Sequence, residues 1–193
     1  SEGGAATADL IEMMEAGAGG NIRFVVQTGG TAQWMAADVI PSDRAARFDI
    51  YDEDMFALWE GPQQNMGDPA TLRGFMEWGF EQYSAQRYGL VLWNHGSGSI
   101  NGVCFDELHD FDSLSLAEIG EALTGYEDRF EFIGFDACLM ATIETAQAVR
   151  PYADYMIASE ELEPGSGWNY KAFGSFLRDN PQADGAQLGQ VVA

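Results

Sequence analysis

Residues 89–98 read GLVLWNHGSG, an unbroken apolar run that stops at a polar segment rich in glycine. Such a run is typical of a strand that is buried on both faces of a parallel sheet. Residues 131–138, EFIGFDAC, have the same arrangement further along the chain. We therefore expect strands at 89–93 and 131–136 that belong to one parallel sheet and end at the same edge of it.

Helical patterns alternate with these strands along the chain. Asp68 and Pro69 mark the start of an amphipathic helix, and residues 115–118 (SLAE) have the spacing of a capping box at the start of another. This alternation predicts right-handed crossovers, and hence an α/β fold whose mostly parallel sheet is covered by helices on both faces. The other expected elements are a helix at 9–16, a strand at 21–27, a loop at 97–114, a helix from Leu139 to Val149 and a strand at 153–159.

The composition excludes several classes of function. With 31 acidic and 9 basic residues the net charge is -22, which leaves no positive patch to neutralise a phosphate backbone. We therefore expect no nucleic-acid partner, and no apolar run reaches the roughly 18 residues of a membrane span. Two cysteines exclude a disulfide framework and a four-cysteine zinc site, so we expect no structural metal. The 46% hydrophobic content suits one domain.

His95 and Cys138 follow the two apolar strands at their carboxyl ends. The functional crevice of an open parallel sheet lies at this edge, so we expect the two side chains to meet there. An imidazole within hydrogen-bond reach takes the proton of a thiol, and the thiolate attacks a carbonyl carbon. The pair therefore predicts a catalytic dyad, with His95 as base and Cys138 as nucleophile. The alternative from residue types alone is an inert buried cysteine and a satisfied core histidine.

The turns after the two strands carry further candidate groups. The backbone N–H groups of Gly96 and Cys138 could form an oxyanion hole for the acyl oxygen. Asp136 lies two residues before Cys138, so the strand period points both side chains to one side of the sheet. If the substrate is a peptide, a carboxylate there would select Arg or Lys at the residue before the scissile bond through a charge-assisted hydrogen bond. Alternatively, Asp136 caps the helix that follows.

Three ordered strings are similar to the motifs of one peptidase family. They are LVLWNHGSG at 90–98, FDACLMATIE at 135–144 and SEELEPGSGWNY at 159–170. Together they resemble the clostripain family of cysteine peptidases, and this resemblance implies a caspase-like three-layer sandwich. Members usually open with a hydrophobic strand, which should precede Ser1 here. We therefore expect residues 1–193 to form a single caspase-like peptidase domain that lacks its first strand and a C-terminal portion.

The resemblance also implies roles for individual residues. His95 corresponds to the catalytic histidine, Cys138 to the nucleophile and Asp136 to the determinant of specificity for basic residues. The implied function is an endopeptidase that cleaves after Arg or Lys through an acyl-enzyme. The same strings assign three more residues to substrate binding: Asn94, Glu160 and Trp168.

Cofactors, partners and location follow from the resemblance as well. It implies no cofactor for the chemistry, calcium dependence in some members, and a secreted or cell-envelope bacterial location. The expected partners are protein or peptide substrates and a second chain or segment that completes the domain.

Of the acidic runs, 49–54 lacks the glycine and terminal Glu of an EF-hand loop, and 106–110 is typical of a solvated loop. Asn169, where relatives can carry an acid, lowers the negative charge expected in the specificity pocket.

Two other functions would use the same residues. A catalytically inactive, peptidase-like binding module would keep the cleft without turnover. Transfer of the acyl group to an amine would pass through the same acyl-enzyme and differ only in the acceptor. Hydrolysis of a peptide distinguishes an endopeptidase from the inactive module. The mass of the product distinguishes it from a transferase.

Overall fold

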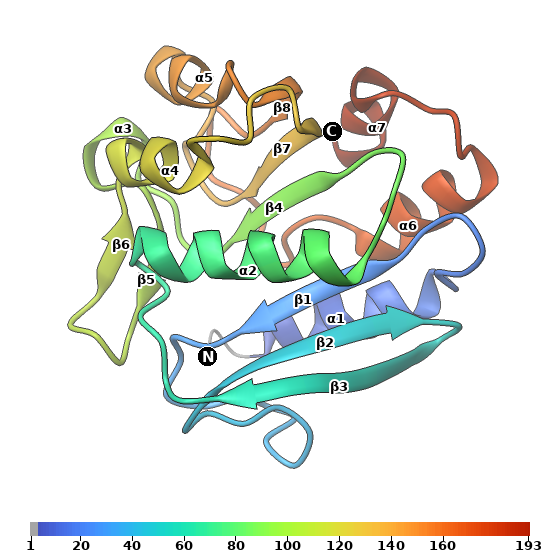
Figure 1. Ribbon diagram of the computed structural model, residues 1–193, viewed down its shortest axis with the longest axis horizontal. Coiled ribbons are helices and arrows are strands. Elements are labelled where there is room, and N and C mark those ends of the chain that lie inside the picture. Colours follow the sequence, from blue (N-terminus) through green and yellow to red (C-terminus); the bar gives the residue numbers. More distant parts are fainter. Residues whose placement is uncertain (1–3) are drawn as a thin grey trace. The chain divides into compact units, whose positions relative to one another are not determined.

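The computed structural model describes residues 4–193 of the chain, which folds into two compact units (Figure 1). The first unit contains the described residues up to Gln64 together with Pro164–Ala193, and the second contains Asn65–Glu163. Both predicted catalytic residues belong to the second unit. None of the helices formed by residues 4–193 has the length and apolar character that a membrane crossing requires.

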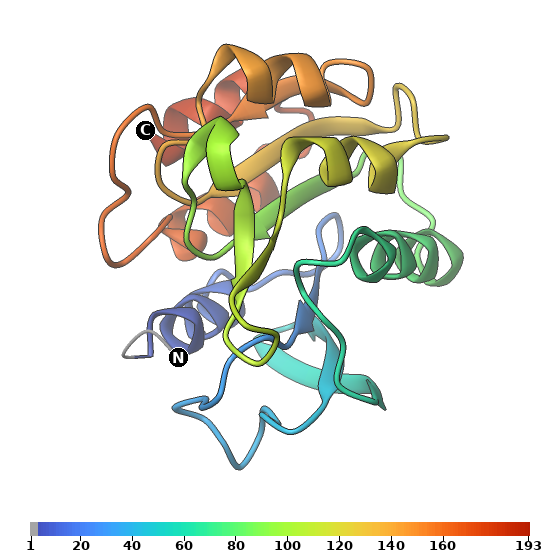
Figure 2. The same cartoon turned by 90° about the vertical axis from the view of Figure 1, so that its left-hand side faces the viewer.

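A parallel three-stranded sheet organises the second unit, with the strand order β4-β7-β8 (Figure 1). A two-stranded antiparallel ribbon, β5 with β6, lies in the segment between β4 and α4 (Figure 2). The elements of this unit are α2 (Pro69–Gln82), β4 (Gly89–Trp93), α3 (Gly98–Asn101), β5 (Val103–Asp106), β6 (Asp112–Leu114), α4 (Leu116–Leu123), β7 (Phe130–Asp136), α5 (Ile143–Val149) and β8 (Ala153–Ile157).

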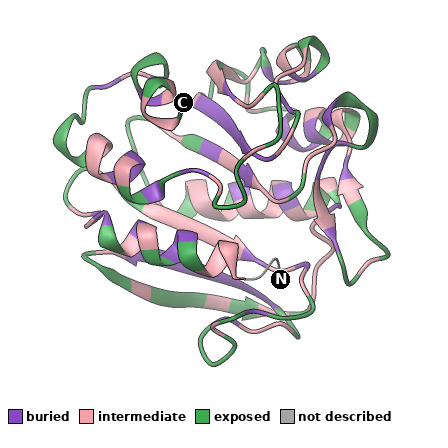
Figure 3. Cartoon of the chain, turned by 180° about the vertical axis from the view of Figure 1, so that it is seen from behind, coloured by how far each residue is buried: buried purple, intermediate pink, exposed green. Residues whose placement is uncertain are grey.

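Helices α2, α4 and α5 begin at residues whose side chains cap them. Asp68 accepts a hydrogen bond from the Ala70 N–H at 2.8 Å, and Pro69 occupies the first turn of α2. Ser115 and Glu118 form the predicted capping box of α4. The inner strand β7 is buried along almost its whole length (Figure 3), as expected for a strand with neighbours on both edges. Its side chains anchor a core to which β4, α2 and α4 also contribute.

The first unit is built on an antiparallel sheet, β1-β2-β3. Helix α1 packs against α6, and α6 packs against α7. The Arg178 guanidinium donates to the carbonyl of Ala16 at 2.7 Å, and Lys171 pairs with Glu15 at 3.0 Å. The elements are α1 (Ala5–Glu15), β1 (Phe24–Thr28), β2 (Ala45–Tyr51), β3 (Asp54–Gly61), α6 (Tyr170–Asp179) and α7 (Gly185–Val192).

The predicted α/β class and its parallel sheet are confirmed, and two local expectations need correction. The segment 97–114 is not a plain loop, because it contains α3 and the β5–β6 ribbon. The acidic run 49–54 spans the end of β2, the turn at Asp52 and Glu53 and the start of β3, two strands that were not predicted. The helix expected from Leu139 begins at Ile143, since Leu139 has a φ of 63°, which a right-handed helix does not accept.

Candidate active site

The carboxyl ends of β4 and β7 lie side by side. Trp93, the last residue of β4, is the register partner of Asp136, the last residue of β7. The pairing continues for one more residue, because the Asn94 N–H donates to the carbonyl of Asp136 at 3.4 Å. His95 lies two residues after Trp93, and Cys138 lies two residues after Asp136. The parallel register therefore delivers both to the same edge of the sheet.

Glycine at position 96 brings the two turns into direct contact. A Cβ built on Gly96 would overlap the carbonyl oxygen of Cys138 and would lie 3.0 Å from the Cβ of Ala137. Only glycine fits such a close approach. The turn that carries His95 is thus packed on the turn that carries Cys138.

The segment that follows His95 continues along the same neighbour. Gly98 has a φ of 64°, and a Cβ there would lie 3.1 Å from the carbonyl oxygen of Leu139. The Ser97 N–H donates to the carbonyl of Gly102 at 2.9 Å, in the bridge that Gly96 makes with Val103. These contacts fix the path of the chain on both sides of His95.

Asn94 shapes the turn in which His95 lies. Its Oδ1 accepts a hydrogen bond from the His95 N–H at 2.6 Å, so the amide side chain holds the backbone that leads out of β4. His95 itself is exposed to solvent, which leaves its ring accessible to a substrate. In this structure the Asn94 carboxamide oxygen therefore organises the histidine turn.

Cys138 is a free, half-buried thiol in the turn after β7. Its Sγ accepts a hydrogen bond from the backbone N–H of Glu163 at 3.3 Å. Glu163 ends a segment, residues 159–163, that we call the strap. The Leu139 N–H donates to the carbonyl of Glu161 at 3.0 Å, so the strap runs directly beside the nucleophile turn.

Asp136 is almost completely buried, with 4% of its surface exposed, and it ends β7. The alternative that it caps the next helix is wrong. The N-cap of α5 is Thr142, whose Oγ1 accepts from the Thr145 N–H at 3.1 Å. A buried carboxylate two residues before Cys138 thus has a role other than starting that helix.

The other predicted binding residues fall into different units. Glu160 lies in the strap and is exposed, close in sequence to the groups that contact Cys138. Trp168 belongs to the first unit, where it is buried and its ring packs near those of Tyr170 and Phe173, with centroid distances of 6.3 and 6.1 Å. The second unit alone therefore brings together Asn94, His95, Gly96, Asp136, Cys138 and Glu160.

The second cysteine, Cys104, is half-buried like Cys138 and packs against the hydrophobic core of the unit. Cys104 lies in β5, with its Sγ 3.9 Å from the carbonyl oxygen of Trp93. Burial raises the pKa of Cys104 to about 12, because a charged sulfur there would lose its hydration. Its thiol is therefore protonated at neutral pH, as expected of a packing residue.

The acidic loop at 106–110 is organised by hydrogen bonds. The carboxylate of Asp106 is completely buried, and it accepts from the backbone N–H groups of Met66 and Leu108, both at 2.8 Å. The Nδ1 of His109 lies 3.1 Å from the same carboxylate. Within residues 4–193, no cluster of three or more His, Cys, Asp or Glu side chains has the arrangement of a metal site.

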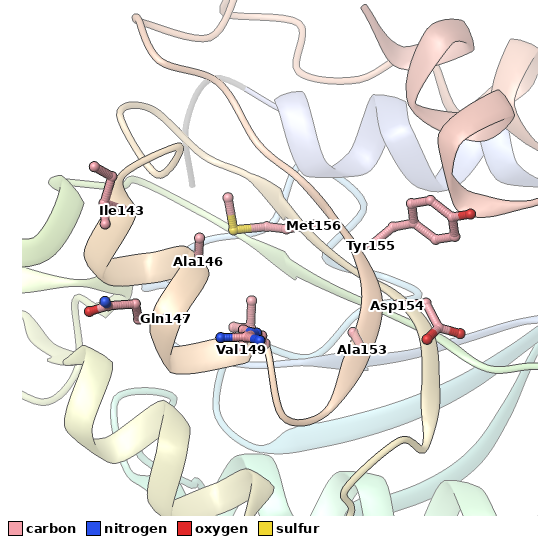
Figure 4. A pocket seen from close by; sticks show the side chains of 9 residues that line it. Ile143, Ala146, Gln147, Val149, Ala153, Asp154, Tyr155 and Met156 are labelled. Atoms are coloured by element: carbon pink, nitrogen blue, oxygen red, sulfur yellow. The ribbon is translucent and has the colours of Figure 1, made fainter.

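A cavity of about 300 Å³ lies between α5 and β8 (Figure 4). Its wall is largely apolar and includes Ala146, Val149 and Met156. Neither His95 nor Cys138 lines it, so this cavity is separate from the chemistry proposed for the strand ends.

The family string at 159–170 contains the strap, but the sequence did not reveal the contact of the Glu163 N–H with Cys138. Pro164 is a local signal for the backbone there, because a residue before proline is held in extended backbone. The left-handed backbone of Leu139 was also missed, since leucine rarely adopts it.

The chain is similar to known cysteine peptidases. The sequence model of the Clostripain family matches residues 4–192. Clostripain of Hathewaya histolytica is 33% identical over 126 residues, which cover 56% of this chain and 24% of that protein. The chain thus spans about a quarter of that curated relative.

Two solved structures share the fold. A secreted cysteine protease of Bacteroides thetaiotaomicron, in complex with an irreversible peptide inhibitor, has a TM-score of 0.80 at 22% identity, over 100% of this chain and 54% of that one. An inactive zymogen of a protease from Parabacteroides distasonis has a TM-score of 0.71 at 24% identity, over 91% of this chain and 49% of that one. These similarities confirm the predicted caspase-like α/β fold, and the chain spans about half of each protease.

Proposed function

This chain belongs to the clostripain family of cysteine peptidases, and on that premise we propose that it forms the part of an endopeptidase that contains a His95–Cys138 dyad. The observation that carries the proposal is the contact of Gly96 with the carbonyl of Cys138. Because that contact packs the two turns together, a substrate carbonyl bound over them would lie within reach of both side chains. The substrates are peptides or proteins, and the chemistry needs no cofactor.

The reaction proceeds through an acyl-enzyme. His95 takes the thiol proton of Cys138, and the sulfur lone pair forms a bond to the carbonyl carbon of the scissile peptide. The carbonyl π electrons move to oxygen, and they return when the C–N bond breaks and the amine leaves with the proton from His95. Water then attacks the thioester carbonyl with His95 as base, the C–S bond breaks to release the carboxylic acid product, and the sulfur of Cys138 takes the proton back from His95.

Backbone amides stabilise the oxyanion in this scheme. We propose the N–H groups of Gly96 and Cys138 as the two donors, because the turns that carry them are packed together. One such donor contributes roughly 3 kcal/mol to a transition state of this type. The two turns are packed so closely that no Cβ fits at position 96. This close packing favours an oxyanion hole of fixed shape.

Asp136 is the proposed determinant of specificity for Arg or Lys at the residue before the cut. Its burial in the same turn region as Cys138 supports this role, because a buried carboxylate is strongly stabilised by a cationic partner. We expect Asp136→Asn to lower kcat/KM for Arg substrates by about 100-fold, the effect of about 3 kcal/mol, since it removes the charge and keeps the shape. An unchanged preference for Arg over Gln substrates would exclude Asp136 from the pocket.

The central experiment is peptide hydrolysis by the full-length protein. A fluorogenic peptide library, varied at the residue before the cut, is incubated with wild type, Cys138→Ala and His95→Ala. We expect cleavage by wild type only, with product peptides that end in a free carboxylate. Cleavage by Cys138→Ala would overturn the proposal. Products joined to an added amine would instead identify a transferase.

Three finer properties are also proposed from the family. A further chain or segment completes the sheet at β8, which within the described residues pairs only with β7, and the compared proteases are about twice as long as this chain. The protein is secreted, like the Bacteroides protease. Activity increases with calcium, as in some family members, and loss of hydrolysis in a chelator with recovery on added calcium tests this point.

A further inference from the structure

We propose that the backbone N–H of Glu163 is a catalytic donor that holds and stabilises the thiolate of Cys138. This inference rests on the proposed function and adds a group to its chemistry. The donor nitrogen lies 3.3 Å from Sγ, and the hydrogen points at the sulfur with hydrogen-bond geometry. Glu163 therefore touches the reacting atom itself.

The strap positions this amide through regular pairing with the nucleophile turn. The Ala141 N–H donates to the carbonyl of Ser159 at 2.9 Å, and the Leu139 N–H donates to that of Glu161 at 3.0 Å. Alternate residues of the strap thus meet alternate residues of the turn, running in opposite directions. Glu163 is the next alternate residue of the strap, and the direction of the hydrogen bond is reversed there: the strap carbonyls accept at Ser159 and Glu161, whereas the N–H of Glu163 donates to the sulfur of Cys138.

Two local features fix the direction of the N–H. Pro164 restricts Glu163 to extended backbone, which limits how far the amide can rotate. Ser159 Oγ accepts from the Glu161 N–H at 3.2 Å and holds the start of the strap. On the other side, the φ of 63° at Leu139 turns the chain immediately after the nucleophile. The donor is thus held in place before any substrate binds.

The chemical role of the donor follows from the charge on sulfur. When His95 takes the thiol proton, the N–H···S contact becomes charge-assisted, while the amide keeps its own proton throughout. A more stable thiolate is also a weaker nucleophile, by about threefold for a tenfold change in its stability.

These opposing effects give a test with a reversal of sign. Glu163→Pro and Glu163→Ala both remove the carboxylate, but only the proline removes the N–H, so their difference isolates the donor. Alkylation of Cys138 by iodoacetamide is followed by mass spectrometry across the pH range. Relative to Glu163→Ala, we expect Glu163→Pro to react about threefold more slowly near pH 7, because the thiolate has lost its donor, and about threefold faster near pH 10, because a thiolate without the donor is the stronger nucleophile.

The outcomes separate this inference from the function on which it rests. Parallel pH profiles for the two variants, or a difference of constant sign, would overturn the donor role even if the wild-type protein hydrolyses peptides. Wild-type protein that neither hydrolyses peptides nor shows faster labelling of Cys138 than of Cys104 would instead remove the dyad.

A second measurement does not depend on the folding of the proline variant. Amide hydrogen exchange is measured by NMR in wild type and in Cys138→Ala. We expect the Glu163 amide to exchange at least about tenfold faster once the sulfur is gone. The amides of Leu139 and Ala141, which bond to strap carbonyls, keep their protection. Equal exchange of the Glu163 amide in both proteins would overturn the inference.

Discussion

Substitution of Gly96 by alanine tests whether the two turns are packed as described. The new Cβ would overlap the carbonyl oxygen of Cys138 and would lie 3.0 Å from the Ala137 Cβ and 3.1 Å from the Met140 Cγ, whereas ordinary contacts measure 3.4–4 Å. The turns must therefore separate by at least several tenths of an ångström, and by more at the backbone oxygen. Strain of this kind lowers the free energy of unfolding by about 1–3 kcal/mol.

The effect on catalysis should exceed the effect on stability. A displacement on the order of 1 Å between a base and its nucleophile costs about 100-fold in rate. We expect kcat/KM of Gly96→Ala, measured with a fluorogenic Arg peptide at a temperature where the variant is folded, to fall by one to two orders of magnitude. Near-UV circular dichroism verifies that the protein remains folded.

Gly74→Ala is the matched control, because Gly74 lies in α2 and a Cβ there meets nothing within 4 Å. A glycine replaced by alanine inside a helix raises the free energy of unfolding by about 1 kcal/mol, and kcat/KM should not change. If Gly96→Ala retains wild-type kcat/KM and the same unfolding temperature, the turns are not in contact and the proposed dyad loses its structural support.

Two further predictions concern cysteine chemistry and the β2–β3 hairpin. Because burial raises the pKa of Cys104 to about 12, its thiol remains protonated below that pH, so iodoacetamide should label it slowly near neutral pH and faster only as the pH approaches 12. Rapid labelling of Cys104 in folded protein near neutral pH would contradict its burial. The hairpin turn has φ values of 51° at Asp52 and 68° at Glu53, so Glu53→Gly should relieve backbone strain and raise the free energy of unfolding by about 0.5–1 kcal/mol in a thermal melt. A lower melting temperature would refute the assignment of this turn.

The parallel sheet and its reactive edge could be predicted from sequence because each depends on short-range patterns. Residues 89–93 and 132–135 are short apolar runs followed by polar residues, a pattern typical of strands in the interior of a parallel sheet. Once both strands lie in that sheet, their carboxyl ends share an edge, whatever the path of the chain between them. The positions of His95 and Cys138 then followed directly.

The strap and the left-handed turn at Leu139 could not be predicted in this way. The hydrogen bond from Glu163 to Sγ joins a backbone amide, which every residue except proline carries, to a sulfur 25 positions away. No side-chain pattern encodes such a contact. Leu139 adopts its φ of 63° although leucine disfavours it, so tertiary contacts override the local preference there. The β2–β3 hairpin was missed for a similar reason, because Asp52-Glu53 lacks the glycine that usually signals its type of turn.

The parallel pairing of β4 with β7 also determines when the turns that carry His95 and Cys138 meet during folding. The pair closes over the intervening α3, β5, β6 and α4, so it is a contact of high sequence separation that forms late relative to local structure. A nascent or partly folded chain therefore has the histidine and the cysteine but not their juxtaposition. On the proposed function, hydrolysis would therefore begin only once β4 and β7 are paired.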